Sequence, residues 1–243
     1  MNVIYEPKGK AKEYAGLACN LYKGCEHGCV YCYAPSATFV KREAFYSQST
    51  PRKDIIKKLK NNCKKINTNT NTNILLSFTS DCYQPIEKEL EITKRALEIF
   101  SEYNLSVSIL TKGGLLATRD FDVLKKNKTN EFAVTLTTDS DSESLKWEPK
   151  ASFPNERIES LLIAKRDFGL KTWVSFEPVF NPEAVYRLIE KTYKFTDFYK
   201  VGKMNHHPIS KEIDWQQFGK NIILIMKKYK KPYIIKKDLQ KYI

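Results

Sequence analysis

The chain has 243 residues, of which 42% are hydrophobic and 12% aromatic, so it can form a sizeable folded core and is not disordered as a whole. Its 41 Lys and Arg residues outnumber its 28 Asp and Glu residues and give a formal net charge of +13, a field that attracts polyanions such as DNA or RNA. Lys-rich helices are also often ordinary solvated faces, so the charge by itself leaves nucleic-acid binding as one of two interpretations.

No apolar stretch approaches the roughly 18 residues that a membrane-spanning helix needs, and the N-terminal segment MNVIYEPKGK lacks the apolar middle of a signal peptide. We expect a cytoplasmic protein that does not contact membranes and that is a monomer. In a reducing compartment, the six cysteines are poor candidates for a disulfide framework, and clustered cysteines more often bind metal or do chemistry.

Short β-branched runs alternate with segments of helical periodicity along the chain. The predicted strands are residues 17–21, 74–79, 105–111, 132–137, 171–176 and 197–201, each bounded by polar or turn residues. Apolar residues at helical spacing lie between or after these strands, around residues 86–100, 158–163, 184–189 and 218–226. The Asn- and Thr-rich segment 67–73 is predicted to be an exposed loop.

This alternation predicts an α/β fold with a parallel sheet and right-handed helical crossovers. Periodicity does not distinguish an open doubly wound sheet from a full or partial (β/α) barrel. In both architectures ligands bind at the carboxyl ends of the strands. Residues that directly follow a predicted strand are therefore the first candidates for a functional site.

Cys25, Cys29 and Cys32 form a CxxxCxxC triplet in the segment KGCEHGCVYCYAP. Soft thiolates select iron–sulfur clusters, copper or zinc. Structural zinc normally takes four ligands, with a second Cys or His pair downstream, and this sequence has no such pair at zinc-ligand spacing. Three thiolates hold three irons of a [4Fe–4S] cubane and leave the fourth iron open to a substrate or cofactor. The triplet therefore predicts a catalytic [4Fe–4S] cluster, and a zinc site that includes His27 is the alternative.

The triplet and the aromatic residue after it resemble the signature of the radical S-adenosylmethionine (SAM) superfamily, and the wider pattern is similar to the branch of spore photoproduct lyase. The matching segments, over about residues 17–206, are NLYKGCEHGCVYCYAP, FTSDCYQPIE, TKGG, LTTDSDSESLKWEPKASFPNER and VGKMNH. The resemblance implies one domain over residues 1–243, a partial (β/α)6 barrel of the TIM type with parallel strands, and a basic C-terminal helix and tail at 207–243.

The resemblance further implies that a [4Fe–4S] cluster and SAM are the cofactors, and that an external reductant of the flavodoxin or ferredoxin type is a partner. In this superfamily the reduced cluster cleaves SAM to a 5′-deoxyadenosyl radical, which abstracts a hydrogen atom from the substrate. The cofactors carry the difficult chemistry, while the protein supplies geometry and excludes water.

Residues of the SAM site are implied by the same segments. Tyr31 corresponds to an aromatic residue whose backbone meets the adenine of SAM. Ser80 and Asp81 correspond to a contact with the methionine moiety, Lys112 to a partner of the SAM carboxylate, and Thr137 to a contact with the ribose. Each has a plainer alternative: packing for the tyrosine, a helix cap for the Ser–Asp pair, surface solubility for the lysine and a turn for the threonine.

Four further polar residues complete the implied ring at the strand ends. Glu148 and Arg157 match the Glu-Pro and Pro-x-x-Arg pattern of the branch and are candidate substrate-site residues. They are expected to form an ion pair that orders a loop over the site, or Arg157 is expected to bind an anion. Glu177 and Asn205 follow two predicted strands and are candidates for the cofactor site.

One departure from the branch bears on the reaction. Photoproduct lyases have a cysteine directly before Thr-Ser-Asp that returns a hydrogen to the product radical, and here Phe78 stands in that place. Repair of the spore thymine dimer is therefore not expected. Cys82 lies close by in sequence and is a candidate catalytic residue, as is Tyr33, which corresponds to a tyrosine with a role in radical relay but is also a common packing position.

The favoured function is a radical SAM enzyme that acts on a nucleic acid or nucleotide, in DNA repair or modification. A second hypothesis keeps the cofactors and has a peptide or small metabolite as substrate. A third is a nucleic-acid-binding module without catalysis that contains structural zinc.

Overall fold

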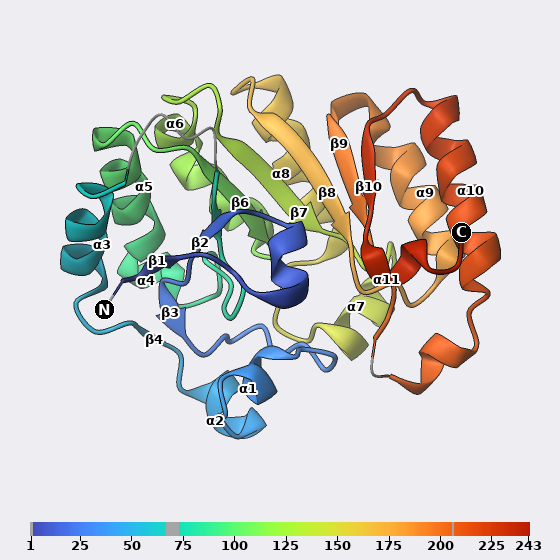
Figure 1. The fold of residues 1–243 in the computed structure, drawn as a ribbon, viewed down its shortest axis with the longest axis horizontal. Coiled ribbons are helices and arrows are strands. Elements are labelled where there is room, and N and C mark those ends of the chain that lie inside the picture. The colour runs from blue at the N-terminus through green and yellow to red at the C-terminus, as the bar shows by residue number, and fades with distance from the viewer. Residues whose placement is uncertain (1, 67–72, 206) are drawn as a thin grey trace.

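The computed structural model describes residues 2–66, 73–205 and 207–243 (Figure 1). Most of the predicted loop at 67–73 therefore lies outside the described residues. The strands of the main sheet, in spatial order, are β1 (Ile4–Tyr5), β2 (Leu17–Cys19), β5 (Ile74–Leu76), β6 (Val107–Thr111), β7 (Glu131–Thr135), β8 (Lys171–Phe176), β9 (Phe198–Val201) and β10 (Tyr233–Ile235). Strand β1 pairs antiparallel with β2, and all other pairs in this sheet are parallel.

The spatial order from β2 to β10 is the same as the order along the chain. A doubly wound sheet reverses direction at a switch point, whereas a barrel adds each new strand on the same side. The order therefore identifies a barrel-type winding, and the sheet stays open because β1 and β10 are its two edges. This confirms the predicted partial barrel of parallel strands.

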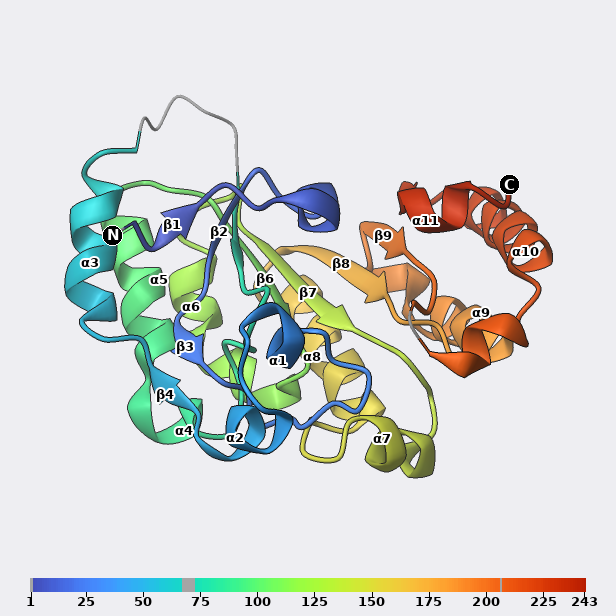
Figure 2. The ribbon, with the colours of Figure 1, turned by 60° about the horizontal axis from the view of Figure 1, so that its bottom comes forward.

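Helices connect the parallel strands and cover one face of the sheet (Figures 1 and 2). The crossover helices are α3 (Ile55–Cys63), α5 (Ile92–Glu102), α6 (Phe121–Leu124), which continues the 3-10 helix η2 (Gly114–Asp120), α8 (Pro154–Arg166), α9 (Pro182–Thr192) and α10 (Trp215–Lys228). None of the helices in the described parts of the chain has both the length and the apolarity that crossing a bilayer demands.

The remaining elements are short. They are β3 (Tyr22–Lys23) and β4 (Thr50–Pro51), which pair into a second sheet, the helices α1 (Ala34–Ala37), α2 (Arg42–Ser47), α4 (Glu87–Leu90), α7 (Asp141–Trp147) and α11 (Lys237–Gln240), and the 3-10 helices η1 (Gly9–Glu13), η3 (Tyr193–Phe195) and η4 (Pro208–Lys211). In Figure 2, α1 and α7 lie near the arrowhead ends of the central strands, where the candidate site is expected.

Helix α9 illustrates how local sequence sets these elements. The side chain of Asn181 accepts hydrogen bonds from the backbone of Glu183 at 2.9 Å and of Ala184 at 3.4 Å, and Pro182 occupies the first helical turn. Both features favour a helix start, because they satisfy or remove free N–H groups. The apolar residues of this helix face the sheet and are buried, as the predicted periodicity required.

Alternation along the strands divides the core into two parts. Leu76, Ile109 and Val134 are fully buried on the face covered by helices. On the inner face, Ala133 leaves space for Trp173, and both are fully buried in a second, smaller cluster. The predicted strand 74–79 ends early, at Leu76, because the following residues leave the hydrogen-bonded ladder and form the loop at the carboxyl edge.

A segment near the N-terminus and one near the C-terminus meet beside the barrel interior. Tyr14, directly after η1, donates from its hydroxyl to Glu177 at 2.5 Å, and Lys236, directly after β10, pairs with the same carboxylate at 2.5 Å. The ammonium of Lys200 donates to the carbonyl oxygen of Tyr14 at 2.8 Å and lies 4.3 Å from the ring centroid of Trp173. Strand β10 was not predicted; the segment was expected to be a basic tail.

Lys200 provides a test of this interior through the pH dependence of stability. Burial lowers the pKa of Lys200 from 10.5 to about 8. Below about pH 8 the folded protein holds a buried charge, which lowers its unfolding free energy. Between about pH 8 and 10.5 the amine is neutral in the folded protein and still protonated in the unfolded chain, so the unfolding free energy rises with pH across this range. Relative to a Lys200→Met variant, the wild type should therefore gain up to about 3 kcal/mol of unfolding free energy between about pH 7.5 and 10.5.

Chemical unfolding followed by circular dichroism under anaerobic conditions measures this difference. A Lys220→Met variant, which removes an exposed lysine on α10, is the control and should show a constant difference from the wild type. A constant difference for the Lys200 variant as well would contradict the prediction.

Candidate active site

The three cysteines lie in a tight loop between β3 and α1. Gly24 has φ +75°, and a Cβ atom there would lie 2.7 Å from the carbonyl oxygen of Phe45, so only glycine fits. Gly28 has φ +67°. The amide of Cys25 donates to the same Phe45 oxygen at 3.0 Å, which fastens the start of the loop to α2.

Side chains of α2 hold the rest of the cysteine loop through its carbonyl groups. Tyr46 donates to the oxygen of Cys29 at 2.7 Å, and Arg42 donates to the oxygens of Val30 at 2.9 Å and of Cys32 at 3.1 Å. All three thiols are free. Burial raises the pKa of Cys25 to about 12 and also raises the pKa of Cys29 and Cys32, so a bound cation is needed to stabilise the thiolates at neutral pH.

The donor set fits a cluster better than a single ion. Within residues 2–66, 73–205 and 207–243, no three Cys, His, Asp or Glu side chains converge closely enough to share one metal ion. A structural zinc ion takes about four donors at one centre, whereas each cysteine of a [4Fe–4S] cluster binds a different iron. The three cysteines match the number of thiolates in a [4Fe–4S] cluster with one open iron and are one fewer than the four donors of structural zinc.

Asp81 connects the ends of two strands to the cysteine loop. One carboxylate oxygen accepts from the backbone of Tyr83 at 2.9 Å and from the hydroxyl of Thr111 at 2.6 Å. The other accepts from the backbone of Lys112 at 2.8 Å and lies 3.4 Å from Nδ1 of His27, which forms no hydrogen bond in the described structure. The carboxylate predicted to contact SAM is therefore occupied by the protein itself.

The electrostatics of this buried group match its partners. Burial alone would raise the pKa of Asp81, but His27 and Lys112 outweigh it and lower the pKa. Burial lowers the pKa of His27 to about 4, so this imidazole is neutral at physiological pH. Burial would also lower the pKa of Lys112, but Cys29, Glu148 and Asp81 surround it and raise the pKa above its ordinary value.

Several groups at the same strand ends lack partners. The hydroxyls of Ser77, Thr79, Ser80 and Thr137 are buried and have no hydrogen-bond partner in the described structure. The ammonium of Lys112 has no ion-pair partner among the described residues either. Buried polar groups are nearly always paired in folded proteins, so this set indicates a polar ligand at the strand ends. The neighbouring Thr138 accepts from the backbone of Ser140 at 3.1 Å, as a turn residue does.

Glu148 and Arg157 form an ion pair with an Nη1–Oε2 distance of 2.6 Å, and both side chains are at most 1% exposed. Arg157 also donates to the carbonyl oxygens of Ser152 at 2.8 Å and Thr135 at 3.1 Å. Tyr31 donates from its hydroxyl to Glu148. The expected ion pair is thus present. Its two predicted roles, ordering the loop after α7 over the site and binding an anionic group, both stay predictions.

The other predicted residues lie around this centre. The ring of Tyr31 packs against Phe180 with centroids 5.4 Å apart. Tyr33 is 57% exposed and donates to the carbonyl oxygen of Phe78 at 2.9 Å. Glu177 faces the barrel interior, and Asn205 donates weakly to the carbonyl of Lys203 at 3.5 Å. Only Tyr33 of these presents a large open surface.

Cys82 does not lie in this site. Its side chain is fully buried in the main core on the face covered by helices, and its sulfur lies 3.7 Å from the carbonyl oxygen of Leu76. Cys82 lies in the turn beyond β5 and packs into the main core, whereas Phe78 packs against the smaller cluster on the inner face. The prediction that Cys82 is a catalytic candidate is therefore at odds with its position.

Sequence reasoning missed the residues that brace the site. The side-chain oxygen of Asn20 accepts from the amides of Phe78 at 2.8 Å and Thr79 at 2.9 Å, and Gln84 accepts from the amide of Glu26 at 2.8 Å. Asn20 and Gln84 lie inside the segments NLYKGC and SDCYQPIE, so their place in the family pattern could have marked them as site residues. Tyr14 and Lys236 lie outside the matching segments, and no sequence pattern pointed to them.

Comparison with known proteins shows the family of this chain. Residues 19–196 match the family model of the radical SAM superfamily. An uncharacterized protein of Methanocaldococcus jannaschii is 30% identical over 192 residues, which cover 76% of this chain and 69% of that protein. The chain therefore belongs to the radical SAM superfamily. The family implies a [4Fe–4S] cluster and SAM as cofactors.

Solved structures share the fold. A mutant of spore photoproduct lyase has a TM-score of 0.72 at 12% identity, over 95% of this chain and 79% of that one. SuiB of Streptococcus suis bound to SAM has a TM-score of 0.64 at 11% identity, over 90% of this chain and 49% of that one. A radical SAM methyltransferase from Sphaerobacter thermophilus has a TM-score of 0.59 at 15% identity, over 90% and 65%. The chain thus spans about half the length of SuiB.

The Glu148–Arg157 pair yields a stability prediction. Arg157→Met leaves the carboxylate of Glu148 buried without its cation and should destabilise the protein by about 3–5 kcal/mol. The double variant Glu148→Gln/Arg157→Met should lose less than the sum of the two single variants, because the two groups interact directly. Chemical unfolding of the three variants measures these values.

Lys146→Met, in the last turn of α7 directly before this loop, is the matched control. Lys146 lies 3.9 Å from Glu143, and both side chains are at least half exposed, so its removal should leave the unfolding midpoint unchanged. Strictly additive effects of the Glu148 and Arg157 substitutions would reject the coupling.

Proposed function

We propose that this protein is a radical SAM enzyme that acts on a nucleic acid or nucleotide, with its cluster bound by Cys25, Cys29 and Cys32. The observation that carries the proposal is one glycine-shaped loop with three free thiols beside a set of unpartnered hydroxyls and the ammonium of Lys112. The substrate class is supported by the net charge of +13, which favours a polyanion.

The residues present fit the two cofactors. Together the cluster and SAM supply a one-electron reductive cleavage of SAM that starts hydrogen abstraction from a substrate. Lys112 is placed to pair with the carboxylate of SAM, and the hydroxyls of Ser80 and Thr137 are free to bind its polar groups. We assign Asp81 the role of a positioning residue, because both its oxygens already bind Thr111 and the backbone.

The barrel interior and the loop after α7 have supporting roles in this proposal. The buried Glu148–Arg157 pair holds that loop against the cysteine loop through Tyr31, which keeps water from the site. Tyr33 faces the remaining open side and is a candidate for a contact with the substrate, while Glu177, in the barrel interior, stays a candidate for the cofactor site. A cytoplasmic protein of the flavodoxin or ferredoxin type is the proposed source of electrons.

We do not assign photoproduct repair to this protein. Phe78 has no transferable hydrogen comparable to that of a thiol, and Cys82 lies behind the sheet. A reaction that needs a cysteine to return hydrogen to the product is therefore not assigned. A peptide or small metabolite is the alternative substrate.

Iron content tests the cluster assignment. Protein purified and reconstituted without oxygen should hold about four irons per chain and form 5′-deoxyadenosine from SAM and dithionite. Replacing Cys25, Cys29 or Cys32 by alanine should remove the cluster absorbance and reduce 5′-deoxyadenosine to background. Cys63→Ala, at a buried cysteine of α3, is the control that should keep both. One zinc and no iron in the wild type would overturn the assignment.

Stimulation by polynucleotides tests the substrate class. The wild type should cleave SAM several-fold faster when single- or double-stranded DNA or RNA is present, and binding should weaken as the salt concentration rises. A peptide mixture and free nucleotides serve as comparison substrates. If no polynucleotide or nucleotide changes the rate, the substrate proposal fails while the cofactor assignment stands.

A further inference from the structure

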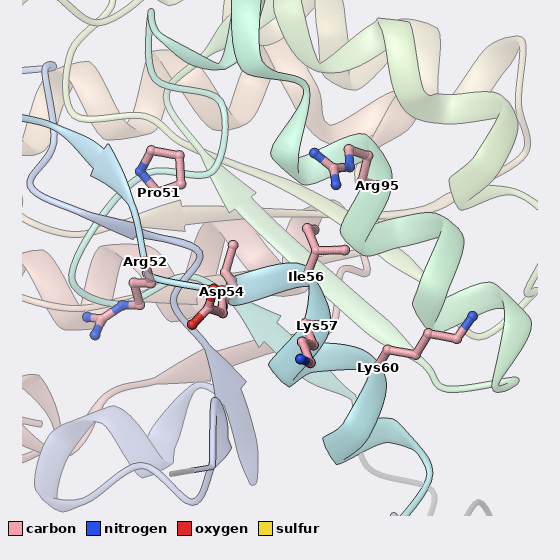
Figure 3. Close-up of a pocket in the computed structure, with 8 residues that line it drawn as sticks. Pro51, Arg52, Asp54, Ile56, Lys57, Lys60 and Arg95 are labelled. Carbon is pink, nitrogen blue, oxygen red and sulfur yellow. The ribbon is translucent and has the colours of Figure 1, made fainter.

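A groove between α3 and α5 lies apart from the cysteine loop and the strand ends. Its volume is about 450 Å³, and its lining residues are Pro51, Arg52, Asp54, Ile55, Ile56, Lys57, Lys60 and Arg95 (Figure 3). Figure 3 shows Ile56 on α3 opposite Arg95 on α5, with Lys57 and Lys60 farther along α3. We call this feature the α3/α5 groove.

The α3/α5 groove combines an apolar floor with a cationic rim. Ile55 is buried and Ile56 is partly buried, whereas Lys57, Lys60 and Arg95 are exposed. Four lining side chains are cationic and one, Asp54, is a carboxylate. Such a surface suits a ligand with an apolar face and regularly spaced anionic groups.

Part of this positive charge is free of partners. Lys60 lies 3.1 Å from Glu102, and Asp54 lies 3.9 Å from Lys58. Lys57 and Arg95 have no ion-pair partner within the part of the chain that the structure describes. Lys57 and Lys60 are three residues apart and therefore lie on one face of α3.

The α3/α5 groove is joined to the catalytic region by backbone contacts. Strand β4 leads into α3 and pairs with β3, which ends directly before Gly24. Arg52, at one end of the groove, donates from its amide to the carbonyl of Leu21 at 2.9 Å and from Nε to the carbonyl of Tyr22 at 3.2 Å. A ligand held in the groove would therefore be held in a defined position relative to the cysteine loop.

We propose that the α3/α5 groove binds the sugar–phosphate backbone of a nucleic-acid strand. Sugar rings suit the isoleucine floor, and phosphates suit the rim formed by Arg52, Lys57 and Arg95. Contacts of this kind position a strand and carry no sequence information, so the groove contributes affinity that is independent of base sequence. This inference rests on the proposed nucleic-acid substrate and assigns the surface that docks it.

The test compares two double variants of the cluster-loaded, full-length protein. Lys57→Gln/Arg95→Gln removes two charges from the groove, and Lys220→Gln/Lys227→Gln removes two exposed charges from α10, on the far side of the molecule (Figure 1). Fluorescence anisotropy with a labelled duplex of about 20 base pairs is measured over a range of salt concentrations. Each phosphate contact contributes roughly 0.9 to the salt slope.

The groove variant should bind about tenfold more weakly at roughly 0.1 M salt and lose about two units of slope, irrespective of base sequence. The α10 variant should retain the wild-type slope, and SAM cleavage without polynucleotide should be unchanged in both. Equal losses in the two variants, or no loss in the groove variant, would overturn the inference and leave the proposed substrate class intact.

Two other outcomes are decisive as well. If the wild type binds no polynucleotide, the proposed substrate class and the groove inference both fail. If duplex binding is unchanged but SAM cleavage driven by an acidic electron-transfer protein falls in the groove variant alone, the groove binds the reductant instead, and the inference is rejected.

Discussion

The carboxylate of Asp81 is the interaction on which the arrangement of the site depends. It accepts hydrogen bonds from the hydroxyl of Thr111 and from the backbone of Lys112, so it ties the end of β5 to the end of β6. It also lies against the imidazole of His27, which belongs to the cysteine loop. A buried carboxylate is costly unless its oxygens are satisfied, and here that requirement keeps three separate segments in register.

A second constraint comes from the open barrel. A closed barrel completes its own hydrogen-bonding ladder, whereas this sheet has two edges and an interior that other segments must cover. The N-terminal segment inserts Tyr14, and the C-terminal segment adds β10 and Lys236, and both side chains meet at Glu177. The residues that seal the barrel are therefore also those that set the polarity of its interior.

Much of the architecture was accessible from local sequence. The six predicted strands correspond to β2 and β5 to β9, because short apolar runs bounded by turns have one stable environment in a parallel sheet covered by helices. The choice between a barrel and a doubly wound sheet was not accessible, since it depends on the order in which strands pair. Strand β10 was missed because a three-residue run among lysines carries no periodic signal.

The sequence by itself determined the chemistry of the loop: three cysteines at fixed spacing, with glycines where the backbone needs positive φ, and polar residues after the strands. Only the tertiary structure decided how these residues are used. In the folded protein, the carboxylate of Asp81 is hydrogen-bonded to other protein groups, and Glu148 is buried in an ion pair with Arg157. The side chain of Cys82 lies in the core and not in the site. The physical reason is that spacing specifies which groups are present, whereas burial and the direction of each side chain at a strand end depend on partners distant in sequence.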